Sequence, residues 1–410
     1  MNVYNLIKKE INGRKSYAVN LTKRLIRIPT VNPPGEGYGK ITALLEKELK
    51  KIGLTTKRVV TPRTVLKKYN IDDRLPRVNL IADWQRGRKR TLHINGHYDV
   101  VPVTGDWKVS PFKGLLRNGK LYGRGAEDMK GTITSMILAV STLKRLDMLP
   151  EVNVQLSFTP DEEIGGMTGF GWLVKEDKIR ADYGLSEGYT GKCISCGNKG
   201  IMWARIECRG KSAHASVPYK GVNSFDAMIE AANALKKLRV RIKKRKTAFK
   251  MKNDRDRFPS MVLGGELEGD NKVNMVPSRV SFSIDRRLIP EENLSSAKRE
   301  IEDVLKSCSK KSGHKFKMRI LAQDPAVAVN PNAMICRAAG SAVKKVFKST
   351  PKLLLMPGGT DMRYLVKKGI PSVGYSARGG ENWHSDNEFI YIKSILDTAK
   401  VYAMTVMNLK

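Results

Sequence analysis

Strand-like and helical segments alternate along the first part of the chain, and this order limits the possible folds more than any other feature. The runs rich in β-branched and apolar residues are expected strands, at residues 78–84, 91–101 and 152–159. Apolar positions with helical spacing predict helices at residues 39–52 and 132–146. Such alternation predicts an α/β layer structure, in which helices flank a mixed, largely parallel sheet.

The pattern changes near Gly197. Six segments then follow in the order β-α-β-β-α-β, at residues 201–208, 222–238, 261–269, 279–288, 293–308 and 314–321. This is the order of a split-βαβ, ferredoxin-like unit, which is a compact domain in its own right. After residue 322 the α/β alternation resumes. A chain of 410 residues exceeds the usual size of one core. We therefore expect a catalytic domain of residues 1–196 and 322–410, interrupted by an inserted domain of residues 197–321.

The chain is strongly basic, with 75 Lys and Arg against 40 Asp and Glu and a net charge of +35. Such a charge would ordinarily suggest nucleic acid as a partner. The densest run, Lys236 to Lys252, is either a solvated helix end with its loop or an anion-binding patch. No helix-turn-helix, zinc-finger or RNP motif accompanies it, so we expect no nucleic-acid partner.

The cysteine content and the hydropathy of the chain indicate the cellular compartment in which the protein is expected. Five scattered cysteines in 410 residues do not resemble the disulfide framework of a secreted protein. The N-terminal stretch lacks a continuous apolar core, and no run of about 18 apolar residues occurs, so we expect neither a signal peptide nor a membrane span. The sequence predicts a cytoplasmic protein with reduced thiols. Cys193 and Cys196 form a C-x-x-C, which could be a redox or zinc motif, but without a second pair we interpret them as structural thiols.

Acidic residues and histidines occur at the ends of expected strands. The segments are INGHYDVVP with His97 and Asp99, LYGRGAEDMKG with Asp128, SFTPDEEIGG with three adjacent acids, and GGENWHSDNEF with His384. Ligands collect at the carboxyl ends of strands in open α/β sheets. Singly, each residue could be a helix cap, a solvated turn or a surface histidine. Together they offer nitrogen and oxygen ligands that suit zinc, cobalt or manganese. If its strand persists, Asp99 lies on the same face as His97 and can orient it.

With these segments the chain resembles the M20 metallo-hydrolases, a family that includes acetylornithine deacetylase, succinyl-diaminopimelate desuccinylase, aminoacylase and glutamate carboxypeptidase. The matching segments run in the family's order from Leu25 to Glu388 and cover nearly the whole chain. They are LIRIPTVNPPGE, INGHYDVVP, GRGAEDMKG, FTPDEEIGG, LSEG, GKSAHASVPYKGVN, NMVPSRVSFSIDRRLIP, PGGTDMRYL and WHSDNE.

The resemblance implies two divalent metal ions, zinc first and cobalt or manganese as alternatives. His97 and Glu187 would hold one ion, Glu163 and His384 the other, and Asp128 would bridge both. Asp99 would then be the partner of His97. Glu162 would be the general base that takes a proton from the attacking water.

The resemblance also implies roles for the inserted domain, which would serve as a lid and as the contact of a homodimer. His214 would reach the partner's active site and help to hold the developing oxyanion. Four residues are similar to positions that bind the substrate's carboxylate: Asn274, Arg287, Gly359 and Thr360. Arg286 could share the task of Arg287 or merely be solvated.

Two positions depart from the family's pattern. Glu127 stands beside Asp128 where a small residue is usual, and Thr132 follows Gly131 where a second glycine is common. Neither change removes an expected ligand, but Glu127 could alter metal preference or the hydrogen bonds around Asp128.

These inferences predict a metal-dependent amide hydrolase that removes the N-acyl group of an amino acid, as in amino-acid biosynthesis. A dipeptidase or carboxypeptidase of the same family is the alternative, because the bond attacked is chemically alike. Outside the enzymes, the alternative is a basic nucleic-acid binder on an inactive scaffold. The intact set of expected ligands argues against it.

Overall fold

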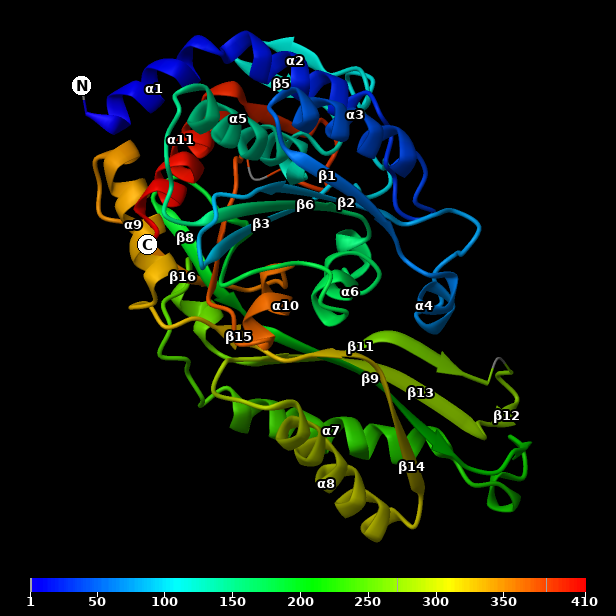
Figure 1. Ribbon diagram of the computed structural model, residues 1–410. Coiled ribbons are helices and arrows are strands. Elements are labelled where there is room, and N and C mark those ends of the chain that lie inside the picture. Colours follow the sequence, from blue (N-terminus) through cyan, green and yellow to red (C-terminus); the bar gives the residue numbers. More distant parts are fainter. Residues whose placement is uncertain (1, 271, 381) are drawn as a thin grey trace. The chain divides into compact units, whose positions relative to one another are not determined.

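The computed structural model describes residues 2–270, 272–380 and 382–410, and these residues fall into two compact units (Figure 1). The first unit contains the chain up to residue 197, residues 329–354 and residues 360–410. The second unit contains residues 198–328 and 355–359. The chain passes between the units near two short strands, β15 (Val327–Ala328) and β16 (Lys352–Met356).

A mixed sheet forms the centre of the first unit. Its strands lie in the order β1-β2-β6-β3-β7-β17-β8. Their bounds are β1 Thr55–Val60, β2 Val78–Trp84, β3 Thr91–His97, β6 Asn153–Thr159, β7 Tyr183–Tyr189, β8 Cys193–Asn198 and β17 Ser372–Tyr375. β3 runs parallel to both β6 and β7, and β17 runs parallel to β7, whereas β1, β2 and β8 pair antiparallel to their neighbours. The predicted mixed α/β fold is confirmed.

Helices flank this sheet on both faces (Figure 1). They are α1 Val3–Gly13, α2 Lys15–Ile26, α3 Tyr38–Lys51, α4 Arg63–Lys68, α5 Gly131–Arg145, α6 Phe170–Lys175, α9 Met334–Phe347, α10 Met362–Lys367 and α11 Ile392–Asn408. Apart from its last residues α5 is buried on all sides, which explains its nearly uninterrupted run of apolar and small residues. A small sheet of β4 (Leu115–Arg117), β5 (Lys120–Tyr122) and β18 (Phe389–Tyr391) lies beside them.

One predicted strand is too long. Residues 91–101 were expected to be extended throughout, but β3 ends at His97. Tyr98 N still donates to Thr159 O at the end of β6, but Val100 then pairs with the segment around Val31, through Val100 N to Thr30 O and Asn32 N to Val100 O. Asp99 lies between these two pairings, beyond the end of β3.

The second unit has its own sheet, in the order β11-β13-β9-β14 with antiparallel neighbours throughout. The bounds are β9 Gly200–Arg209, α7 Ser224–Ile242, β11 Ser260–Gly269, β13 Arg279–Leu288, α8 Leu294–Ser312 and β14 Lys315–Asp324, with a short ladder of β10 (Ala213–His214) and β12 (Met275–Val276). Buried side chains of α7, α8 and the sheet form a separate core. The basic run Lys236 to Lys252 covers the last turns of α7 and the following loop.

Among the described residues, no helix combines the length and the hydrophobicity needed to cross a bilayer. All five cysteines are free thiols.

Candidate metal centre

Three neighbouring strands bring acidic residues and a histidine to one edge of the main sheet. β3 ends at His97, β7 carries Glu187, and β6 is followed by the short helix η2 (Glu162–Ile164). β17 passes close to β7 because residue 374 is a glycine: a Cβ there would lie 2.2 Å from the carbonyl oxygen of Glu187. The carboxyl ends of parallel strands meet at one edge, so the expected ligands from separate motifs become neighbours.

Asp128 lies between the two histidines. Its Oδ1 is 3.3 Å from Nε2 of His97, and its Oδ2 is 3.4 Å from Nε2 of His384. His97 Nε2 is also 3.6 Å from Oε2 of Glu187, and His384 Nε2 is 3.0 Å from Oε2 of Glu163. One carboxylate therefore joins a pair formed by His97 and Glu187 to a pair formed by Glu163 and His384.

The described residues contain two groups of potential metal ligands. Within each group, the ligand atoms lie within 4.8 Å of one another. One group is His97, Glu162 and Glu187, and the other is Asp128, Glu163 and His384. Imidazole nitrogens with carboxylate oxygens are the donor set that zinc, cobalt and manganese accept. This donor set fits two divalent ions.

Charge repulsion in this cluster is strong. Burial, followed by the neighbouring charge of Glu187, raises the pKa of Glu162 well above its usual range. Burial also raises the pKa of Glu163. Burial would likewise raise the pKa of Asp128, but its contacts with His384 and His97 outweigh that effect and hold the pKa well below its usual range. Carboxylates this close repel one another unless cations compensate them, and bound cations would do so.

Asp99 fixes the position of η2 through backbone bonds. Its Oδ1 accepts from the backbone N–H of Glu162 and its Oδ2 from that of Glu163, both at 3.2 Å. His97 Nδ1 lies 3.4 Å from Oδ1 and 3.2 Å from the carbonyl oxygen of the same aspartate. One carboxylate thus orients the imidazole of His97 and the two glutamates together, which is more than the orienting contact with His97 that was expected.

Asp161 belongs to a buried network beneath the site. Its carboxylate accepts from Asn32, Tyr38, Thr168 and Arg77, and the Arg77 guanidinium is only 1% exposed. Arg77 further donates to the carbonyl oxygens of residues 34, 72 and 75. This network holds the turn between β6 and η2, so Asp161 positions the two glutamates that follow it.

Arg77→Met is expected to lower the free energy of unfolding by about 3 kcal/mol, because it leaves the Asp161 carboxylate buried and unpaired. Chemical denaturation of the purified variant measures this loss. The matched control is Arg74→Met, whose side chain is 85% exposed in its pair with Asp72 and should leave the free energy of unfolding nearly unchanged. Equal losses in both variants would show that the buried Arg77–Asp161 pair stabilises the fold no more than the exposed Arg74–Asp72 pair does.

Two further acids hold the backbone around Asp128. Glu388 accepts from the N–H groups of Gly125, Glu127 and Asp128 and pairs with buried Arg124 at 2.8 Å. Glu127 accepts from the N–H groups of Gly379 and Asn382, in the loop that leads to His384. The acid that departs from the family's pattern therefore ties this loop to the segment that carries Asp128.

Glu127→Ala is expected to weaken metal affinity about tenfold, because groups that position metal ligands contribute effects of this size. Metal titration followed by calorimetry or a competing chelator measures the change. Glu127→Gln retains an acceptor oxygen and should lose less. If both variants bind metal as tightly as the original protein, Glu127 does not position the His384 loop.

Sequence reasoning missed two residues beside Glu162. Arg363 Nη1 lies 3.9 Å from Glu162 Oε1, and Arg363 Nη2 donates to the carbonyl oxygen of Gly165. Asp361 is buried and accepts from the side chain of Asn95, and burial raises its pKa to about 7. Both lie in PGGTDMRYL, the segment from which only Gly359 and Thr360 had been selected.

The residues expected to bind substrate or to assist from the inserted domain differ in their unit, burial and hydrogen bonds. Thr360 belongs to the first unit, is buried, and its hydroxyl has no hydrogen-bond partner among the described residues. The others belong to the second unit: His214, Asn274, Arg287 and Gly359. His214 is exposed and bonded to Ser216, and Arg287 forms a two-pronged pair with Asp285.

Arg286 is neither solvated nor available for substrate. It is completely buried and pairs with Glu292 at 2.7 Å. Its neighbour Arg287 is partly exposed, because successive side chains of β13 point to opposite faces of the sheet.

Comparison with known families establishes the family to which the chain belongs. A model of peptidase family M20/M25/M40 matches residues 93–408. The chain belongs to the M20 peptidase family. The resemblance found in the sequence segments is thereby confirmed.

Relatives within the M20 family span nearly the whole chain. An uncharacterized metallohydrolase of Methanocaldococcus jannaschii is 30% identical, over 94% of this chain and 97% of its own length. Aminoacylase-1 of Sus scrofa is 27% identical, over 88% of this chain and 86% of its own. The crystal structure of an M20 family metallo-carboxypeptidase from Sulfolobus solfataricus matches with a TM-score of 0.73 and 22% identity, covering 95% of this chain and 98% of that one. The mixed α/β fold is thus that of solved M20 structures.

Proposed function

We propose that this M20 protein is a dinuclear metal-dependent amide hydrolase that removes the N-acyl group from an amino acid. The position of Asp128 carries the proposal, because its two oxygens face His97 and His384 on either side. His97 and Glu187 would hold one ion, Glu163 and His384 the other, and Asp128 both. Zinc suits this donor set best, with cobalt or manganese as alternatives.

Two bound divalent ions would lower the pKa of a water molecule and polarise the amide carbonyl. Glu162 takes the proton of the attacking water and returns it to the leaving nitrogen. The Asp99 carboxylate keeps Glu162 beside the ligands by holding its backbone N–H. Arg363, 3.9 Å away, limits where the Glu162 carboxylate can turn. No covalent intermediate with the protein is required.

The second unit would complete the enzyme as a ferredoxin-like lid and dimer contact, inserted between residues 196 and 322. Its element order and its β11-β13-β9-β14 sheet support this proposal. His214 would help to stabilise the oxyanion in a partner subunit. Asn274, Arg287, Gly359 and Thr360 would bind the substrate's carboxylate, for which a guanidinium fork is well suited. In that state Arg287 must exchange its pair with Asp285 for the substrate.

A dipeptidase or carboxypeptidase is the second candidate, favoured by the structural match to the Sulfolobus metallo-carboxypeptidase. The match to aminoacylase-1 favours the deacylase. A panel of N-acetylornithine, N-succinyl-diaminopimelate, other N-acyl amino acids and dipeptides, compared by kcat/KM, separates the two. Absence of hydrolysis across the panel by metal-loaded protein would contradict both.

Removal of metal is expected to abolish hydrolysis, because Glu162 alone cannot activate water for attack on an amide. Dialysis against a chelator followed by metal analysis and rate measurement tests this expectation. Zinc, cobalt or manganese should restore the rate at up to two ions per chain. An unchanged rate in protein shown to be free of metal would contradict the proposed function.

A further inference from the structure

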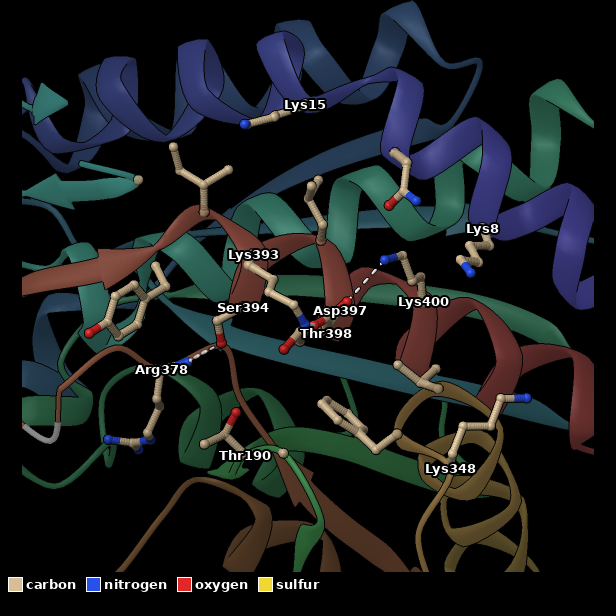
Figure 2. A pocket seen from close by; sticks show the side chains of 18 of the residues that line it. Lys8, Lys15, Thr190, Lys348, Arg378, Lys393, Ser394, Asp397, Thr398 and Lys400 are labelled. Atoms are coloured by element: carbon tan, nitrogen blue, oxygen red, sulfur yellow. Dashed lines mark hydrogen bonds and ion pairs between the residues drawn. The ribbon is translucent and has the colours of Figure 1, made fainter. Parts of the chain in front are cut away.

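A second concave site lies in the first unit, and its lining contains none of the residues assigned to hydrolysis. A cavity of about 1010 Å³ is lined by residues of α1, the first residue of α2, the end of α9 and the first turns of α11 (Figure 2). Thr190 and Gly191, in the turn between β7 and β8, also line it. Cavities that bind small molecules are of comparable size.

The lining of this cavity is more strongly cationic than the rest of this basic chain. It contains six cations and one carboxylate, against 75 and 40 in the whole sequence. The cations are Lys8, Lys15, Lys348, Arg378, Lys393 and Lys400. Six positive charges less the one negative charge of Asp397 leave an excess of five.

Asp397 compensates only part of this charge. It pairs with Lys393 at 2.5 Å and with Lys400 at 2.9 Å, and Figure 2 shows these side chains side by side on α11. Lys8 and Lys15 are exposed and form no ion pair with any residue that the structure describes. Like charges gathered in a concavity focus the electric field and attract anions.

Arg378 and Lys348 add donors from other segments. The Nε–H of Arg378 donates to the carbonyl oxygen of Gly188, and the guanidinium carbon lies 4.8 Å from the ring centre of Trp383. Lys348, just after α9, lies 5.7 Å from the ring centre of Tyr4. Neither forms an ion pair within the described part of the chain. The Arg378 charge also favours the ionised carboxylates of Glu127 and Asp128, whereas the Lys348 charge remains available to an anion.

Neutral groups in the lining also suit an anionic organic molecule. The hydroxyls of Thr190 and Ser394 donate to no oxygen of the described residues, although Ser394 Oγ accepts from the backbone N–H of Arg378. Phe347 and Tyr391 supply aromatic surface. The cavity thus combines free hydroxyl donors with apolar walls.

We propose that this cavity binds a small polyanion that carries phosphate groups. Lysine ammonium groups are compact point charges that bind phosphate oxygens. One phosphate monoester carries a charge of about −1.5 to −2 at pH 7, so two phosphates offset about three to four of the five excess positive charges and a third offsets the remainder. A concave site favours a small molecule, whereas a nucleic acid would need an extended basic face.

Isothermal titration calorimetry of the full-length, metal-loaded protein tests the site. The probes are inorganic pyrophosphate, ATP and adenosine, at an ionic strength of about 0.15 M to screen non-specific attraction. We expect pyrophosphate and ATP to bind once per chain and adenosine, which lacks phosphate, not to bind. Tighter binding of ATP would identify a nucleotide, and equal affinities would identify a free diphosphate group. Binding of adenosine as tight as that of ATP would overturn the proposal.

The decisive comparison is between two double variants of equal charge. Lys8→Glu/Lys15→Glu is expected to raise the Kd of pyrophosphate at least about tenfold, because two attractive charges become repulsive. Lys47→Glu/Lys57→Glu changes the net charge equally at exposed lysines outside the cavity and should leave the Kd within about twofold. Lys348→Glu, on a different element, should also weaken binding.

Several results would overturn the proposal. Phosphates can bind the metal ions of the catalytic site, and binding of that kind would be equally strong in both double variants. Failure of pyrophosphate and ATP to bind at all, or preferential binding of a single-stranded oligonucleotide, would equally exclude a small-molecule phosphate site. Because none of these measurements requires hydrolysis, the result is independent of the proposed catalytic function.

Discussion

Glu162→Gln is expected to reduce kcat about 10³-fold while the protein retains its metal ions, because the variant loses only the proton acceptor. Glu162 stands among the proposed ligands and pairs with Arg363 at 3.9 Å, whereas Glu163 lies 3.0 Å from His384. Steady-state kinetics together with metal analysis of the same sample measure both quantities.

Two comparisons make this prediction specific. Glu163→Gln should lose metal as well as activity, since its carboxylate is a proposed ligand. Glu176→Gln, an exposed glutamate on the same unit, should change neither. Full activity in Glu162→Gln would exclude Glu162 as the general base, and loss of metal in that variant would make it a ligand instead.

The candidate ligands could be predicted from sequence because the motifs that carry them follow expected strands. β3, β6 and β7 are parallel neighbours, so residues at or after their ends meet without further adjustment. His97 and Glu163 are therefore brought together by sheet topology; the alternation of segments predicts the largely parallel sheet, and the family resemblance implies the ligands. His384 follows the same logic after β17, the next parallel neighbour of β7.

The supporting residues could not be predicted in this way. Arg77 is one of 75 cationic residues in the chain, and nothing local distinguishes it from the solvated ones. Only the fold buries it against Asp161, which lies 84 positions later. Asp99 likewise lies beyond the end of β3, and the backbone N–H groups that it accepts from are 63 and 64 positions later.

The cationic cavity could not be predicted from the sequence either. The densest basic run in the sequence, residues 236–252, covers a helix end and a loop in the second unit. The cavity instead collects single cations from distant segments, such as Lys8, Lys348 and Arg378. Charge density along a sequence is therefore a poor guide to charge density in space for a chain this basic.

Asp128→Asn is expected to lower the metal content below two ions per chain and to reduce hydrolysis at least about 10³-fold. An amide has the shape of a carboxylate but only one oxygen, so it can no longer present an oxygen to both His97 and His384. Loss of the negative charge further weakens both proposed ion sites. Metal analysis after gel filtration and kinetics at saturating zinc measure the two effects.

The fold should survive this substitution, because the backbone N–H of Asp128 that bonds to Glu388 is unchanged. Circular dichroism and thermal unfolding verify that point. Asp147→Asn, a substitution of the same kind at an exposed site, should change neither the metal content nor the rate of hydrolysis. If Asp128→Asn bound two ions and retained its activity, the bridging role would be wrong. If instead it bound one ion and kept substantial activity, a single ion, held by only one of the two pairs, would suffice for the reaction.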